Sequence, residues 1–226
     1  STFIQAGNSS FKVNLQQPHT ASYIAFDKTT CPSPQFIEKI TNQNLHGIVN
    51  TDYIIVTHPS LLSEAERLAE FHRAFNKLTV NVVTTTQVFN EFSSGSQDVT
   101  AIRDFAKLLY DRGINGGRPL KHLLLFGDAS YDYKDQEENN TNLVPIYQSY
   151  NSYDPPFSYC SDDYYAILDD NEGYWGINSR DEGLDIGVGR LPVSNLAEAT
   201  IVVDKILHYH TEASLGDWIK RLTFVG

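Results

Sequence analysis

The chain has 226 residues, enough to bury the apolar surface that folding requires without a metal or a disulfide. Its formal net charge of −11 would repel a phosphate backbone, which excludes nucleic acid as an expected partner. No apolar run reaches about 18 residues and no secretory signal is present, so we expect no membrane span. The chain contains no methionine, which predicts a processed product or an excised fragment.

Residues 1–50 differ in pattern from the rest of the chain. Short alternating runs, FKVNL and SYIAF, are separated by Pro, Thr and Asn, and TTCPSPQF (29–36) is typical of a loop. Residues 1–50 are therefore predicted to be a short β-rich segment, either the tail of a preceding domain or a linker.

From residue 51 onward, buried strands are expected at regular intervals. The continuous apolar run YIIVTHP (53–59) predicts a strand that is buried on both faces. Three similar runs follow, namely LTVNVVTT (78–85), HLLLFGD (122–128) and LDIGVGRLPV (184–193).

Helices are predicted between these strands from their caps and their apolar spacing. Ser63 and Glu66 form a capping-box pattern, Asp98 can cap a second helix, and Asn195 and Glu198 can cap a third. The residues expected to face inward on the three helices are Ala65, Leu68, Ala69 and Phe75; Val99, Ile102, Phe105, Ala106 and Leu109; and Ala199, Val202, Val203, Ile206 and Leu207.

Three further segments complete the expected elements. NEFSSGSQ (90–97) is predicted to be a polar loop. DDYYAILDD (162–170) and EGYWGI (172–177) flank an acidic turn and predict a hairpin. RLTFVG (221–226) is expected to begin one more strand.

The alternation of strands and helices predicts an α/β fold with a mostly parallel sheet and flanking helices. In such sheets, functional groups collect at the carboxyl ends of the strands. We expect those ends at His58-Pro59, Thr84–Thr86, Gly127-Asp128, Gly189-Arg190 and Gly226.

Acidic residues near these ends raise two alternatives. Asp128 and Asp132 could bind a cation or contact a substrate, or they could accept backbone N–H groups in a tight loop. Asp169, Asp170 and Glu172 offer oxygen ligands that suit calcium, but their spacing does not match the twelve-residue calcium loop. The alternative for this second group is a solvated acidic turn.

The residues alone do not form a complete catalytic set. Cys160 with His58 is the thiol–imidazole pair that could be considered, but neither Cys31 nor Cys160 directly follows a central strand. The two cysteines are compatible with one bridge or with two free thiols. His208 and His210 are expected to cap the end of a helix. The chain has no Walker loop, no Gly-x-Ser-x-Gly and no His-Glu-x-x-His.

Several segments resemble the gingipain family of cysteine peptidases, in order, from about residue 22 to residue 226. They are TDYIIVTHP, LTVNVVTTTQVFNEFSSGSQDVTAIRDF, LLLFGDASYDY, SDDYYAILDD and LDIGVGRLPVSNLAEATIVVDKILHY. Within the family, the chain is most similar to the sortase branch, the C-terminal signal peptidases of the type IX secretion system of Bacteroidetes.

The resemblance implies a caspase-like fold with two subdomains side by side. Residues 51–215 would form the first subdomain, and residues 216–226 would form the truncated start of the second, catalytic subdomain. In the family, a histidine in a His-Gly motif and a cysteine that ends the next strand perform catalysis, and both follow the strand that RLTFVG begins. The one His-Gly of this chain, His46-Gly47, precedes the first predicted strand, and both cysteines precede RLTFVG, so neither motif occurs at the family's position. We therefore assign no catalytic residue and expect the isolated chain to be inactive.

The resemblance also implies substrates, partners and a location. The sortase branch removes C-terminal secretion signals from cargo proteins and is associated with transfer of the cargo to a lipopolysaccharide-type anchor. The protein would be exported to the outer-membrane surface or beyond, together with other subunits of the secretion system. Family members bind calcium near acidic loops, so calcium is a candidate cofactor for Asp128, Asp132, Asp169, Asp170 and Glu172. The alternative to an enzyme is a non-catalytic α/β module that docks cargo or partner subunits.

Overall fold

The computed structural model of the chain has two units, Ser1–Thr41 and Asn42–Gly226. It describes residues 26–27, 29–36, 39–149, 151, 153–154, 158–170, 172, 183–211 and 214–224. In the first unit, residues 29–36 form a turn followed by irregular chain, as predicted for TTCPSPQF. The runs FKVNL and SYIAF lie outside the described residues, apart from Phe26.

A parallel four-stranded sheet forms the centre of the second unit. Its strands are β1 (Tyr53–Thr57), β2 (Val80–Thr84), β3 (His122–Phe126) and β6 (Gly187–Leu191), in the order β2-β1-β3-β6. All four predicted strands and the predicted parallel α/β fold are therefore confirmed. The expected burial of the fourth strand is wrong, because β6 lies at the edge of the described sheet and its residues are exposed or half-buried. A separate antiparallel pair joins β4 (Tyr147–Gln148) to β5 (Cys160–Ser161).

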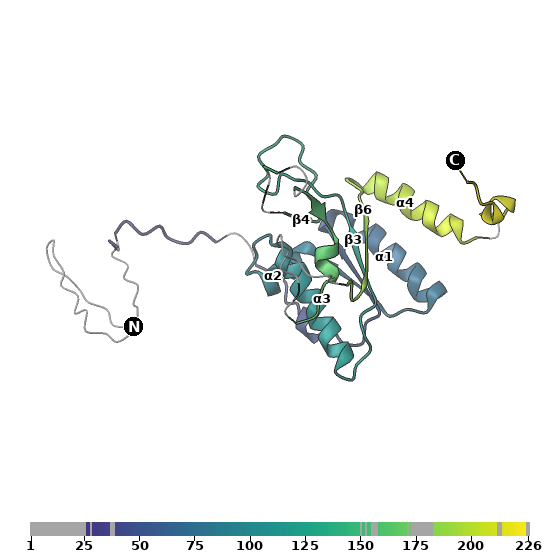
Figure 1. Cartoon of the computed structure of the whole chain (residues 1–226). Helices are drawn as coiled ribbons and strands as arrows, with labels where there is room; N and C mark the ends of the chain where they lie inside the picture. Colours follow the sequence, from purple (N-terminus) through teal and green to yellow (C-terminus); the bar gives the residue numbers. More distant parts are fainter. Residues whose placement is uncertain are drawn as a thin grey trace. The chain divides into compact units, whose positions relative to one another are not determined.

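Helices cover both faces of the sheet, as Figure 1 shows: α2 and α3 lie on one side of β3, and α1 and α4 lie on the other. Their bounds are α1 (Leu62–Phe71), α2 (Thr85–Phe92), α3 (Val99–Ile114) and α4 (Leu196–Tyr209). Among the described residues, every helix is too short or too polar to cross a membrane.

Alternation along the strands divides the buried side chains between two cores. In β1, Val56 packs with the α2–α3 side, where Phe105 is fully buried. The preceding residue, Ile55, points to the other face of the sheet, where it packs in the same core as Leu68 of α1. Because both faces are covered at the two central strands, β1 and β3 are continuous apolar runs, which explains why the sequence predicted them correctly.

Two of the predicted helix caps are confirmed. The Asp98 carboxylate accepts a hydrogen bond from the Thr100 amide at 2.8 Å, and the Asn195 side chain accepts one from the Glu198 amide at 3.0 Å. The predicted inward faces of α3 and α4 are also buried or half-buried.

The predicted start of α1 is wrong. A 3-10 turn, Pro59–Leu61, precedes the helix, and Leu61 is the N-cap of α1, so Ser63 lies inside the helix. Pro59 has the φ angle that a helical first position requires, which starts the turn earlier than the capping pattern suggested. The helix also continues into a π-helical turn, His72–Asn76, and Phe75 is 57% exposed instead of buried.

Helix α2 is not among the predicted elements. The predicted loop over residues 90–97 is confirmed for residues 93–97, whereas residues 90–92 belong to the end of α2. The helix begins immediately after β2 with a capping box. The Gln87 amide donates to the Thr84 hydroxyl at 3.2 Å, and the Thr84 amide donates to the Gln87 side chain at 2.8 Å. Thr84, the first of three consecutive threonines, both ends β2 and caps α2. No turn residues therefore separate the strand pattern from the helix pattern in the sequence.

The hairpin expected from residue 162 is also wrong in its first arm. Asp163–Ala166 form a 3-10 helix in which Tyr165 is fully buried, and its hydroxyl donates to the Pro145 carbonyl at 2.7 Å. The second arm lies largely outside the described residues.

The segment RLTFVG contains no strand over residues 221–224, where Leu222 and Phe224 are 84% and 91% exposed. A strand needs a neighbour for its backbone groups, and no described strand pairs with this segment.

At the amino edge of the sheet, a buried carboxylate joins three segments. Asp52 accepts hydrogen bonds from the Thr79 amide and from Arg118, each at 2.9 Å, and Lys121 lies 3.3 Å away. Burial raises the pKa of Asp52, but these three donors outweigh burial and lower it. This edge is a structural junction between β1 and its neighbours.

Candidate functional site

The carboxyl edge of the sheet has a topological switch point between β1 and β3. The chain leaves β1 toward β2, on one side, and leaves β3 toward β6, on the other. Such switch points are where open α/β sheets bind ligands. At this point, the Thr57 hydroxyl donates to the Phe126 carbonyl at 2.9 Å, which places His58 and Gly127 at the ends of adjacent strands.

One predicted strand end is wrong, because Gly189 and Arg190 lie inside β6, which ends at Leu191. The predicted end at Thr84–Thr86 is confirmed at Thr84, where β2 ends, and residues 85 and 86 already belong to α2. Residues 225–226 lie outside the described part, so the expected end at Gly226 does too. The predicted ends at His58-Pro59 and Gly127-Asp128 are confirmed.

Both the backbone conformation and the neighbouring side chains require a glycine at position 127. It has a φ of +153°, and an added Cβ would lie 2.9 Å from Cγ2 of Val144 and 3.2 Å from Cβ of Leu143. Its amide donates to the Leu191 carbonyl at 3.0 Å. Gly127 therefore allows the returning segment, residues 143–144, to pass directly over the end of β3.

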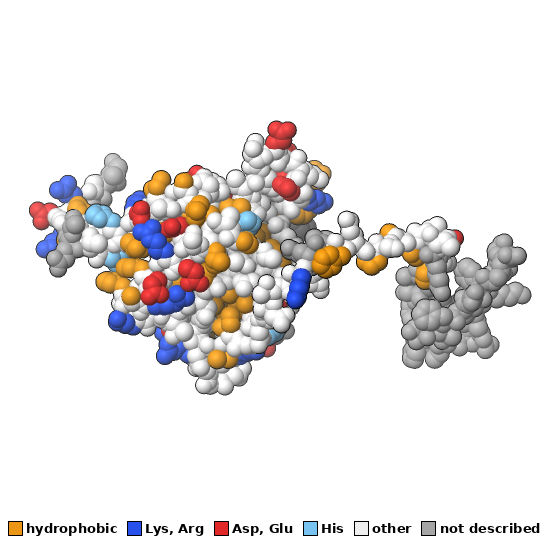
Figure 2. Space-filling model, turned by 180° about the vertical axis from the view of Figure 1, so that it is seen from behind, with side chains coloured by type: hydrophobic (Ala, Val, Ile, Leu, Met, Phe, Trp, Pro, Cys, Tyr) orange, Lys and Arg blue, Asp and Glu red, His pale blue; other side chains and the backbone are white. Residues whose placement is uncertain are grey.

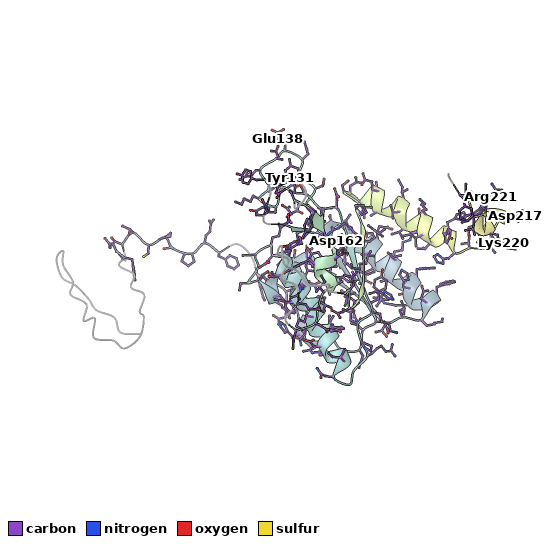
Figure 3. The ribbon with its side chains drawn as sticks, in the orientation of Figure 1. Tyr131, Glu138, Asp162, Asp217, Lys220 and Arg221 are labelled. Atoms are coloured by element: carbon purple, nitrogen blue, oxygen red, sulfur yellow. The ribbon has the colours of Figure 1, made fainter. Side chains whose placement is uncertain are left out.

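Asp128 and Asp132 organise the loop between β3 and β4, which projects beyond the sheet and carries the labelled Tyr131 and Glu138 in Figure 3. The Thr141 hydroxyl donates to the Asp128 carboxylate at 2.6 Å. Asp132 is 8% exposed, and one of its oxygens accepts the Gln136 and Glu137 amides at 2.6 and 2.7 Å.

Arg190 and Asp162 form a partly buried ion pair next to this loop, and the sequence did not reveal it. Nε and one Nη of Arg190 donate to the two carboxylate oxygens at 2.8 and 2.7 Å. The Arg190 side chain also donates to the carbonyls of Gly127, Val144 and Pro145 at 2.9, 2.7 and 3.1 Å. One guanidinium therefore fixes the start of the loop, its return and the segment before the 3-10 helix. Both side chains are largely buried, at 10% and 20% exposure.

The second acidic group lies against α3 and the start of β6. Ligand oxygens of Asp169, Glu172 and Asp185 lie within 4.8 Å of one another. The Tyr110 hydroxyl lies 3.1 Å from a carboxylate oxygen of Asp169 and 3.2 Å from one of Asp185, and its single hydrogen can be donated to either. Burial together with these carboxylates raises the pKa of Tyr110 to about 12. Three carboxylates fit the preference of calcium for oxygen ligands. Asp185 was not among the predicted candidates, because it lies far from the other two in sequence.

Cations from α3 hold the same turn in place. Arg103 donates to the Ile167 carbonyl at 2.6 and 2.9 Å. Lys107 donates to the Leu168 carbonyl at 2.6 Å, and its Nζ lies 3.0 Å from a carboxylate oxygen of Asp170. Asp170 is thus engaged by a cation, while Asp169 and Glu172 join Asp185. The structure places the five predicted acidic residues in two separate groups.

The candidate thiol–imidazole pair is not assembled in the structure. His58 is half-buried, burial lowers its pKa, and its Nδ1 lies 2.8 Å from the Ser60 hydroxyl. Cys160 is an exposed free thiol in β5, outside the four-stranded sheet, and Cys31 is an exposed free thiol in the first unit. Among the described residues, neither cysteine ends a strand of the central sheet.

His210 has the predicted structural role at the end of α4. It is the C-cap residue, and its Nδ1 lies 2.8 Å from the Ile206 carbonyl. Its ring packs on Phe71 and Phe75 at centroid distances of 5.0 and 5.2 Å. His208 lies in the last turn of the helix, where a cation would favour the helix dipole.

Among solved structures, the chain is similar to dimeric latent PorU from Porphyromonas gingivalis. The two are 38% identical with a TM-score of 0.74, and the match covers 86% of this chain and 19% of that one. The complex of the P. gingivalis RgpB pro- and mature domains matches at 18% identity and a TM-score of 0.47, over 71% of this chain and 29% of that chain. The comparison with curated proteins gives no match.

The chain spans about a fifth of the PorU chain that it matches. At this level of identity and coverage, the shared four-stranded sheet and its flanking helices reflect the caspase-like fold that the resemblance implied. The model of peptidase family C25, the gingipain family of cysteine peptidases, matches residues 49–226, and the chain belongs to that family.

Proposed function

We propose that this chain is the first α/β subdomain of a cysteine-type endopeptidase that cleaves C-terminal secretion signals from cargo proteins. In this proposal, the enzyme serves the type IX secretion system, together with other subunits, at the outer-membrane surface or outside the cell. The observation that carries the proposal is the 38% identity to PorU over 86% of the chain.

The arrangement of the carboxyl edge supports a role for this chain in binding substrate. The carboxyl edge presents His58 and the loop after Gly127, and Arg190 holds that loop firmly. Neither described thiol lies at the end of a central strand, where a nucleophile would be positioned rigidly. The role that we propose for this subdomain is to form part of the substrate-binding cleft, while the nucleophile and its histidine belong to the second subdomain.

The proposal is tested by comparing the isolated chain with the full-length protein that contains it. Each is incubated with a cargo protein that carries its C-terminal signal, and the products are identified by mass spectrometry. We expect the full-length protein to release the signal, and the isolated chain to show neither turnover nor labelling by a thiol-reactive peptidyl inhibitor.

Two results would overturn this assignment. Turnover by the isolated chain, with labelling of Cys160 and loss of activity in His58→Ala, would make the pair in this chain the catalytic one. A full-length protein that leaves the cargo intact but binds it would favour the alternative, a non-catalytic docking module. His58 follows β1 of the four-stranded sheet, whereas Cys160 lies in β5 of the separate antiparallel pair, which argues against the first result.

A further inference from the structure

The central sheet ends at β2 on one side and at β6 on the other, and β6 has an open outer edge (Figure 1). The Gly187 amide of β6 donates to the carbonyl of Lys121, which precedes β3, at 2.8 Å. Because backbone groups alternate in direction along a strand, those of Val188 and Arg190 point away from β3. In the described part of the chain, no group binds the backbone N–H or C=O of either residue.

The outer edge of β2 is blocked by side chains of neighbouring residues. The Arg73 guanidinium donates to the outward carbonyl of Val80 at 2.8 and 3.1 Å. At the other end of the strand, the Gln87 side chain accepts the outward amide of Thr84 at 2.8 Å. An edge strand that lacks such protection is a template for pairing with another strand. The contrast indicates that the sheet accepts a further strand at β6.

A hollow beside β6 has room for a side chain of such a strand. Gly187 and Gly189 leave the α1–α4 side of β6 without side chains, and a Cβ added to Gly189 would meet nothing within 4 Å. The hollow has a volume of about 410 Å³. Its lining includes both glycines and Tyr53, His72, His122 and Leu124. Strand addition combines backbone hydrogen bonds with a pocket for a side chain, and this edge offers both.

The handedness of the connections excludes the strand that would directly follow α4. Helix α1 connects β1 to β2 over one face of the sheet, and α2 and α3 connect β2 to β3 over the other face. Helix α4 packs on the same face as α1. A right-handed connection from α4 would therefore lead in the direction of β2, away from the open edge. A strand that pairs with β6 has to come from elsewhere.

We propose that the outer edge of β6 pairs with a β-strand from a part of the full-length protein outside this chain. The inference rests on the proposed function, which makes this chain one subdomain of a longer peptidase. The similar PorU chain is about five times as long as the part that matches. A permanently open edge would promote aggregation, so a partner within the same protein fits it better than a transient one. Figure 2 shows cationic and anionic side chains interspersed on the face that it presents, so charge does not indicate a different partner there.

Hydrogen–deuterium exchange of the full-length protein, resolved to single amides, tests the pairing. The amides of Val188 and Val82 are a matched pair, because both belong to half-buried valines and point outward from an edge strand. We expect the Val188 amide to exchange at least about tenfold more slowly than the Val82 amide, as an added hydrogen bond requires. The inward amide of Gly189 gives the rate of a paired group. Equal rates at the two valines would overturn the proposal.

Proline variants give a second, independent test. Proline removes the amide hydrogen and is tolerated in an edge strand only where that hydrogen faces solvent. In the full-length protein, Val188→Pro should therefore lower the melting temperature more than Val82→Pro. The variants Val188→Ala and Val82→Ala correct for the loss of the two side chains. Equal losses from the two prolines, after this correction, would contradict the pairing.

The same exchange measurement identifies the partner. Protection of Val188 in the isolated chain that rises with its concentration would assign the edge to a second copy, and protection only after addition of cargo would assign it to the substrate. Either result would overturn the proposal.

Exchange does not depend on activity, so the two claims can fail separately. A full-length protein that protects Val188 but leaves the cargo intact would contradict the proposed function and support the pairing. A full-length protein that cleaves the cargo, with equal exchange at Val188 and Val82, would support the proposed function and contradict the pairing.

Discussion

Arg190 joins several segments at the carboxyl edge of the sheet, and no motif in the sequence indicated these contacts. Its guanidinium binds the carboxylate of Asp162 with two parallel hydrogen bonds and reaches three carbonyls of the neighbouring loop. The planar fork of arginine matches this set, whereas the single ammonium group of lysine does not. We infer that Arg190 and Asp162 maintain the wall of the candidate cleft.

Removing one partner of this pair is expected to leave the other charge buried without compensation. For Arg190→Gln we expect a loss of about 3 kcal/mol in the free energy of unfolding, measured by urea denaturation. Asp162→Asn should give a loss of similar size.

The double variant distinguishes a pair from two independent sites. If the two residues act together, Arg190→Gln with Asp162→Asn should cost clearly less than the sum of the single losses. Arg190→Lys keeps the charge and should still lose stability, because it cannot form both bonds to Asp162 and reach the three carbonyls. Full stability in Arg190→Lys would show that charge alone maintains the loop.

At the scale of elements, Glu91 attaches the segment before β1 to α2. Its carboxylate accepts the Leu45 and His46 amides at 2.7 and 3.1 Å and the Gln43 side chain at 2.9 Å. The His46 ring lies 2.7 Å from the same carboxylate and stacks on Phe92 at 4.5 Å. Burial raises the pKa of Glu91, but the donors outweigh burial and lower it to about 2.

This lowered pKa predicts a defined dependence of stability on pH. The usual pKa of the group is 4.5, so its contribution is fully present above that pH and is lost as the pH falls toward about 2. Glu91→Gln should be less stable than the wild type by about 2 kcal/mol at pH 7, as expected for hydrogen bonds to a charged group.

The two proteins should approach equal stability near the lower end of this range, as followed by urea unfolding at several pH values. The pKa of Asp52 is also lowered, but Asp52 is present in both proteins. The difference in stability between the wild type and Glu91→Gln therefore reports the effect of Glu91. A stability difference that is constant from pH 7 to pH 2 would contradict the assignment.

At the scale of the whole molecule, the calcium hypothesis involves two separated acidic groups. Asp128 and Asp132 each accept hydrogen bonds from donors of their own loop. Asp169 and Asp185 also accept hydrogen bonds, but together with Glu172 they bring ligand oxygens of three carboxylates within 4.8 Å of one another. We therefore expect calcium, if it binds, to bind the second group. Ligand binding to the folded state adds about 2.7 kcal/mol at a hundredfold excess over Kd, so the melting temperature should rise with calcium concentration.

One variant in each acidic group shows which of the two groups binds calcium. Asp169→Asn should abolish the rise in melting temperature, while Asp128→Asn should retain it. A melting temperature that is the same with calcium and with a chelator would contradict the calcium hypothesis for this chain. Magnesium serves as the control for ionic strength and for divalent charge in general.

The sequence was most informative where one physical signal dominated. The strands were predictable because burial on both faces requires apolar residues at every position, as in Ile54, Ile55 and Val56 of β1. The caps at Asp98 and Asn195 were predictable because they satisfy local amides. The same logic failed at Thr84, because one residue both ends β2 and caps α2.

The sequence by itself determined the parallel α/β fold, the family resemblance and Gly127-Asp128 at the carboxyl end of a central strand. Only the tertiary structure decided that Arg190 meets Asp162, that Asp185 joins Asp169, and that Glu91 binds the segment before β1. The reason is physical. Local patterns record burial and capping, which depend on near neighbours in the chain, whereas these side chains meet only after distant segments pack around the sheet.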